Sequence, residues 1–196
     1  GDLRDAWNGD SSFRVVGQAG YFLADEVIPN DPLFNLQYHL ESYSPNSGYP
    51  MISEAWEYTT GSPDVKIGII DGGFDLDHED LSSRIASTYR AASGGSDADP
   101  ATATEDHGTH VAGIAGAVTN NGIGVSGVNW QSPLYLARAG EYYSLSSLAQ
   151  GVFFRDDYAG DCIDWLRNQD VDIQNMSFGY TDDLWSEAFK DFFFGN

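Results

Sequence analysis

Cysteine is almost absent from this sequence, since Cys162 is the only one among 196 residues. A single cysteine cannot form an internal disulfide framework, and it cannot build the thiolate cage of a structural zinc site. Its neighbours, Asp161-Cys162-Ile163-Asp164, favour the interpretation of a small apolar residue on a helix. A disulfide scaffold and a thiolate zinc site are therefore excluded.

Positive charge is scarce as well. Lys and Arg together number 9 against 30 Asp and Glu, which gives a formal net charge of −21. Nucleic acids and anionic membrane surfaces are bound by clustered cations, so we expect neither as a partner. No apolar run is long enough to span a bilayer. Such an acidic balance suits an enzyme that works outside the cell or in salt, which makes a saline habitat a hypothesis.

The residues that are present indicate a folded protein. Apolar residues make up 41% and aromatics 14% of the chain, too many for a disordered one, and the length suffices for one domain with a sizeable core. The chain opens with Gly1 and carries no charged-then-apolar leader, and three adjacent phenylalanines, 192–194, stand almost at its other end. We therefore expect that any secretory signal has been removed or was never captured, and that partner structure is missing at the carboxyl end.

Strand and helix patterns alternate along the chain. The apolar run at 65–70 is typical of a strand buried on both faces, as in a parallel sheet. Further strands are predicted at 134–139 and 171–177, helices at about 52–58, 107–118 and 182–194, and a helix or helix pair at 145–168. The alternation predicts an α/β fold, a parallel β-sheet flanked by helices.

Two residues in this pattern are placed for catalysis. Asp71 ends the first buried strand, and ligands gather at the carboxyl ends of parallel strands. His107 begins the next long helix, at the rim of a cleft. A carboxylate that meets an imidazole suits general-base chemistry. Taken singly, each is weak evidence, because an aspartate at a strand end is usually a turn former and a lone histidine is usually structural.

The surrounding motifs resemble those of the subtilisin-like serine proteases. The segment 67–81 looks like the family's aspartate segment, and 107–114, His-Gly-Thr-His-Val-Ala-Gly-Ile, matches the histidine segment residue for residue. The segment 171–179 resembles the strand that lines the primary specificity pocket. The motifs occur in the order Asp then His that subtilisin uses. The resemblance covers 31–196 and implies a subtilisin-like fold that is incomplete at its carboxyl end.

The resemblance also implies roles for particular residues. Asp71 would orient the imidazole, and His107 would be the general base and acid. Peptide substrate would lie as an added strand along three residues, Ser177, Phe178 and Gly179. Tyr142 and Tyr143 are candidate walls of further substrate subsites. The family usually has Ser or Thr directly after its catalytic aspartate, and Gly72 stands there instead, which weakens the support of the carboxylate.

The nucleophile of such a protease is not recognisable here. Seven serines follow His107, at 126, 132, 144, 146, 147, 177 and 186, and none stands in a Gly-Thr-Ser-Met-Ala-like segment. Without a nucleophile and oxyanion donors this chain alone is predicted not to hydrolyse peptides. We expect the amino-terminal part of a serine endopeptidase. The alternative is a natural, inactive subtilisin-like module that binds peptides.

A calcium site is the cofactor that the resemblance implies. Calcium takes about six to eight oxygen ligands from carboxylates and from carbonyls of a turned loop. The segment 117–125 resembles the calcium loop of the thermitase-like branch of the family. The implied ligands are Asp31, Asp80, Thr119, Asn121, Ile123 and Val125. By spacing alone, an ordinary Asn-Gly turn beside two unrelated surface acids explains these residues better; the calcium site depends on the resemblance.

The domain prediction separates two parts. Residues 1–30 are interpreted as a propeptide remnant or a linker, and 31–196 as the amino-terminal part of a peptidase domain. The family resemblance and the acidic composition predict a secreted or extracellular protein that acts on peptides or proteins. The oligomeric state is left open.

Overall fold

The structure, a computed structural model, describes residues 27–40, 52–102, 104–146 and 149–179, together with two short strands before them. The described residues fall into two compact units, those of 1–28 with 38–59, and those of 29–37 with 60–196. The first contains an antiparallel pair, β1 (Arg14–Val16) and β2 (Tyr21–Leu23), and a short helix, α2 (Ile52–Ala55). The predicted role of 1–30 as a propeptide remnant or linker stays a prediction.

The second unit is built on a four-stranded parallel sheet. Its order is β4 (Ile85–Arg90), β5 (Leu134–Arg138), β3 (Ile67–Asp71) and β8 (Ile173–Met176). The central strand β3 is buried at every position, which is why its sequence is a continuous apolar run. The predicted α/β class with a parallel sheet is confirmed.

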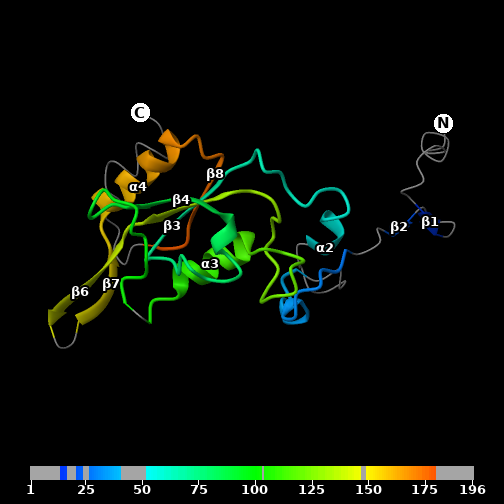
Figure 1. The fold of residues 1–196 in the computed structure, drawn as a ribbon, viewed down its shortest axis with the longest axis horizontal. Coiled ribbons are helices and arrows are strands. Elements are labelled where there is room, and N and C mark those ends of the chain that lie inside the picture. The colour runs from blue at the N-terminus through cyan, green and yellow to red at the C-terminus, as the bar shows by residue number, and fades with distance from the viewer. Residues whose placement is uncertain are drawn as a thin grey trace. The chain divides into compact units, whose positions relative to one another are not determined.

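One helix covers each face of this sheet (Figure 1). On one face, Ile69 of β3 and Leu136 of β5 pack with Ala112 of α3 (His107–Gly116). On the other face, Ile70 packs with Cys162 and other residues of α4 (Asp156–Asn168). Cys162 is a fully buried, free thiol on a helix, as its sequence context predicts, and burial raises its pKa to about 12.

One prediction about secondary structure is wrong, and one strand was missed. The helix predicted at 145–168 is α4 only from Asp156 onward; before it, β6 (Gly140–Ser146) and β7 (Ala149–Phe154) form an antiparallel hairpin. The strand β4 was not expected, because only part of its Ile-Ala-Ser-Thr-Tyr-Arg sequence is apolar. Such a pattern is typical of an edge strand, which is half covered. Two 3-10 turns, Phe34–Leu36 and Ser82–Arg84, complete the assignment.

The helix predicted at 182–194 lies outside the described residues. Within the described part of the chain, no helix is both long and apolar enough to cross a membrane.

Candidate active site

The carboxyl ends of β3, β4 and β5 lie at the same edge of the sheet, and Asp71 is the last residue of β3. Its carboxylate is almost fully buried, at 1% exposure. The Gly72 N–H donates to Asp71 Oδ1 at 2.7 Å, and the Ala139 N–H donates to the Asp71 carbonyl at 3.0 Å. Asp71 is therefore held both by its neighbour in sequence and by the strand beside it.

His107, the first residue of α3, meets this carboxylate. Its Nδ1 lies 2.9 Å from Asp71 Oδ1 and 3.0 Å from Oδ2, while about half of the imidazole, 53%, is exposed. The hydrogen bond to Asp71 is the largest cause that raises the pKa of His107, and the charges of Glu105 and Asp106 add to it. An Nδ1–H directed at the carboxylate leaves Nε2 free to accept a proton from a nucleophile.

Gly108 makes the close approach of α3 to β3 possible. A Cβ at this position would lie 2.2 Å from the Gly73 carbonyl oxygen and 3.0 Å from Asp71 Cβ. No residue with a side chain fits there without moving backbone. The glycine after the histidine thus brings the start of the helix directly against the end of the strand.

The space beside Gly72, where the family usually has a hydroxyl side chain, is occupied. A Cβ on Gly72 would meet Glu105 Oε1 and Val152 Cγ1, each at 3.2 Å. Glu105 is half buried and, among the described residues, its carboxylate has no hydrogen-bond or ion-pair partner. Sequence reasoning missed this residue, because Glu105 lies in a polar loop without a motif.

The three predicted substrate-binding residues follow β8 at the same edge as Asp71. Ser177 and Gly179 are exposed, and Phe178 stacks on Phe154 of the hairpin with ring centroids 4.3 Å apart. The Asn175 amide donates to Ser177 Oγ at 2.8 Å. Among the described strands, β8 is the terminal strand of this sheet.

The candidate subsite walls, Tyr142 and Tyr143, lie on β6. Tyr142 is 43% exposed. The ring of Tyr143 contacts the ring of Phe153 of β7, with centroids 6.4 Å apart. They belong to the unexpected hairpin, and their role in substrate binding stays a prediction.

The predicted calcium ligands also come together. Asp80 is 1% exposed; its Oδ1 accepts from the Asn121 side-chain amide at 2.8 Å, and its Oδ2 accepts from the Val125 N–H at 2.9 Å. The Ile123 N–H donates to Asn121 Oδ1 at 2.7 Å, and Thr119 Oγ1 accepts from the Gly127 N–H at 2.8 Å. The loop that carries these residues is thus closed on the Asp80 carboxylate.

Asp31 anchors the same loop from a distant part of the sequence. It is 5% exposed and accepts four hydrogen bonds: from the N–H groups of Asn120, Asn121 and Gly122 at 2.8, 3.0 and 3.2 Å, and from Ser126 Oγ at 2.7 Å. Burial raises the pKa of Asp80, and the negative charge of Asp31 raises it further. Within the described residues, no group of three or more His, Cys, Asp or Glu side chains is arranged to hold a metal ion.

Comparison with known proteins agrees with this geometry. A sequence profile described as "Subtilase family" matches residues 62–194, more than half of the chain. Halolysin from Haloferax mediterranei is 37% identical over 153 residues, which cover 76% of this chain and 26% of that protein. The halolysin-like extracellular serine protease Nep from Natrialba magadii is 34% identical over 159 residues, covering 78% and 26%.

A solved structure supports the fold. A serine protease of Aeromonas sobria, in complex with a chaperone, superposes with a TM-score of 0.65 at 18% identity, covering 94% of this chain and 31% of that one. The chain thus spans about a quarter to a third of the lengths of these proteins. This chain belongs to the subtilase family.

Proposed function

We propose that this chain supplies the aspartate and the histidine of a subtilisin-type serine endopeptidase. The observation that carries the proposal is the pair of contacts, 2.9 and 3.0 Å, between His107 Nδ1 and the buried Asp71 carboxylate. Asp71 fixes the tautomer and orientation of the ring and stabilises the imidazolium that forms during the reaction. His107 Nε2 takes the proton of a serine hydroxyl as it attacks the peptide carbonyl, and returns it to the leaving amine.

The nucleophile is proposed to lie beyond Asn196. Of the seven serines after His107, five lie at described positions; among these, Ser126 is buried in the loop beside Asp31, where it donates to that carboxylate, and Ser177 follows β8. Neither has the Gly-Thr-Ser context expected of the nucleophile. Without that serine the present residues hold and move a proton but form no acyl intermediate.

The proposed substrate is an extended peptide. It would pair with the backbone at 177–179, beyond the end of the edge strand β8, and so pass beside Asp71 and His107. The exposure of Ser177 and Gly179 supports this path. An extracellular location is proposed as well, on the similarity to an extracellular relative.

Calcium is the proposed structural cofactor. Asp80 accepts only two hydrogen bonds and keeps lone pairs for a cation, and it has no Lys or Arg partner among the described residues. Asn121 and the carbonyls of Thr119, Ile123 and Val125 would add the further oxygens. The four hydrogen bonds to Asp31 fill its acceptor sites, so it would bind the ion directly only if one donor moved away.

Two measurements test the endopeptidase proposal. Continuing the reading frame past Asn196 should reveal a Gly-Thr-Ser-like segment. The protein expressed from that complete frame should then react with a fluorophosphonate probe at one serine and cleave denatured protein substrates, and His107→Ala should abolish both. A stop codon shortly after Asn196, or peptide binding without labelling or cleavage, would instead establish the alternative, an inactive peptide-binding module.

A further inference from the structure

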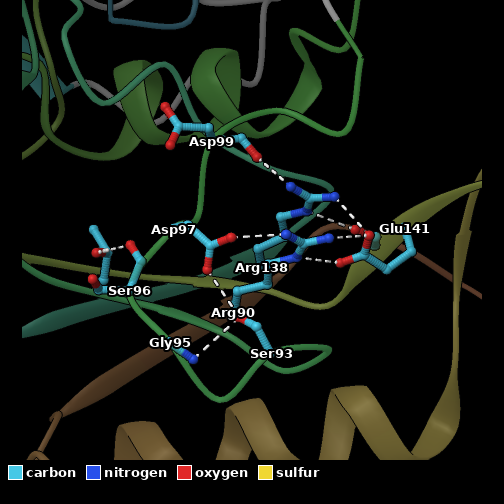
Figure 2. A network of polar contacts seen from close by, with 10 residues as sticks. Arg90, Ser93, Gly95, Ser96, Asp97, Asp99, Arg138 and Glu141 are labelled. Atoms are coloured by element: carbon cyan, nitrogen blue, oxygen red, sulfur yellow. Dashed lines mark hydrogen bonds and ion pairs between the residues drawn. The ribbon is translucent and has the colours of Figure 1, made fainter.

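Four charged side chains form a network (Figure 2). It lies at the carboxyl edge of the sheet, where Arg138 of β5 is the register partner of Asp71. Glu141 accepts from Arg90 Nε and Nη2 at 2.7 and 2.8 Å, and from Arg138 Nη2 at 2.7 Å. Arg90 Nη1 also donates to Asp97 at 2.8 Å. Two guanidinium groups thus share one carboxylate, and the network of Arg90, Asp97, Arg138 and Glu141 is neutral overall.

The centre of this charge network is buried. The side chains of Arg138 and Glu141 are 7% and 13% exposed. Desolvation lowers the pKa of Arg138, while the charge of Glu141 raises it. If one partner were removed, the others would stay charged where water scarcely reaches them, which is costly. Because any arrangement that breaks a contact carries this cost, the network holds one geometry.

The network is connected to the backbone that follows Asp71. Arg138 Nη1 donates to the Asp99 carbonyl at 2.7 Å, and Arg138 Nε donates to the Gly140 carbonyl at 3.0 Å. The Asp99–Pro100 backbone lies against Gly73, where a Cβ would be 2.5 Å from Pro100 Cα and 2.8 Å from the Asp99 oxygen. The Phe74 N–H donates to the Ala98 carbonyl at 2.9 Å. Arg138 therefore holds the segment 98–100 against the turn after the catalytic aspartate.

The same turn touches α3 on its other side. The Gly73 carbonyl lies so close to Gly108 that a Cβ there would be 2.2 Å away. Gly73 is thus enclosed between 99–100 and the residue after His107. The Gly72 N–H, which bonds Asp71 Oδ1, belongs to this turn. A shift of 98–100 would consequently be passed to both partners of the Asp71–His107 pair.

We propose that Arg138 and Glu141 are positioning residues for this pair: by fixing 98–100 against Gly73 they keep the Asp71 carboxylate and the His107 imidazole in hydrogen-bonding geometry. The inference rests on the proposed function for its kinetic consequence. The hydrogen bond itself is open to measurement whether or not the protein cleaves peptides. Both residues act through the backbone of 98–100 and Gly73, so the predicted effect falls on the chemical step.

The test uses the protein from its complete reading frame, with Arg138→Met, Arg138→Lys and Glu141→Gln. Arg138→Met is expected to lower kcat about 10- to 100-fold with KM nearly unchanged, because small misplacement of a catalytic pair is costly. Lysine keeps the charge but cannot donate to Asp99, Gly140 and Glu141 together, so Arg138→Lys is expected to give an intermediate loss. Arg167→Met is the matched control, since Arg167 pairs with Asp164 at an exposed site on α4.

The pKa of His107, followed by NMR, separates positioning from charge. Loss of the Arg138 charge alone would raise the pKa of His107, whereas loosening of its bond to Asp71 lowers it toward the ordinary value of 6.5. We expect it to fall in Arg138→Met. Loss of the Glu141 charge by itself lowers the pKa of His107, so Glu141→Gln is judged by kcat alone. If Arg138→Met is unstable, Arg138→Lys, which keeps the charge, carries the test in the folded protein, and the pKa of His107 is expected to fall there as well.

Two outcomes would overturn the inference. The first is a lower melting temperature of the Arg138 and Glu141 variants while their kcat and the pKa of His107 match the wild type. That result would show a purely structural role. The second is a pKa of His107 that rises in Arg138→Met. A wild-type protein that cleaves nothing while its variants still lower the pKa of His107 would count against the proposed endopeptidase and leave the positioning role intact.

Discussion

The edge of the sheet around Asp71 and the loop at 119–125 both bury carboxylates, but they neutralise them differently. At the sheet edge, Asp71 faces His107, and Glu141 faces two arginines. At the loop, Asp31 and Asp80 meet mainly N–H groups and one amide, and each is the other's neighbouring charge. The chain, which has only 9 cationic residues to 30 acidic ones, thus places its own cations at the first site. The second is where we propose a calcium ion from solution.

The largest predicted effect is at the sheet edge, where the charge of Asp71 is removed. Asp71→Asn keeps the size of the side chain but removes the charge that fixes the imidazole, and a loss of kcat of about 10⁴-fold is expected in the protein from its complete reading frame. Asp64→Asn, at an exposed turn, is the matched control. Activity of Asp71→Asn within tenfold of the wild type would remove Asp71 from the proposed mechanism.

The second prediction concerns removal of calcium. If the ion at 119–125 is present at 100 times its dissociation constant, chelation should lower the free energy of unfolding by about 2.7 kcal/mol. Asp80→Asn should make the melting temperature insensitive to both calcium and chelator, because it removes the carboxylate with free lone pairs. A wild-type melting temperature that does not respond to chelator would contradict a calcium site there.

A smaller effect is expected at Gly124. Its φ is +53°, and a Cβ would lie 2.4 Å from Asp80 Oδ2. Gly124→Ala therefore adds a clash with the carboxylate to the backbone strain of about 1–2 kcal/mol. Gly94, with φ +69° and nothing within 4 Å of its Cβ position, is the matched control for strain alone. Thermal unfolding should show Gly124→Ala as the less stable variant, and it should also weaken calcium binding; equal losses would show that Asp80 can move freely.

The smallest predicted effect concerns the pH dependence set by His107 at the sheet edge. In the proposed mechanism the neutral imidazole is the base, so activity should rise as pH passes upward through the raised pKa of His107. Glu105→Gln removes one of the charges that raise this pKa, and the acid limb of the kcat profile should move to lower pH. Its shift should be smaller than that caused by loss of Asp71. A shift to higher pH would contradict the assignment of this limb to His107.

Much of this fold could be predicted because its central elements carry local patterns. The sequence of β3 is a continuous apolar run because both faces of the strand are buried. Helix α3 begins at a motif that is specific to the family. The aspartate at the strand end and the histidine at the helix start follow from these two elements. Their juxtaposition at 2.9 Å is what the topology of a parallel sheet adds.

The remaining features depend on contacts between distant residues. Strand β7 falls within the predicted helix, because the pairing of the hairpin β6–β7 is recognisable only across its two strands, through contacts such as Tyr143 with Phe153. The edge strand β4 lacks a strong apolar pattern. Arg138 and Glu141 belong to no motif, and only their shared position beside Arg90 and Asp99 gives them significance.

The most direct test of the account is an NMR titration of the His107 ring in the wild-type protein and in Asp71→Asn. The account predicts a pKa above 6.5 in the wild type and a clear fall in the variant, because the hydrogen bond to Asp71 is the main cause of the raised value. A wild-type value at or below 6.5 that Asp71→Asn leaves unchanged would contradict the pairing on which the proposed chemistry depends.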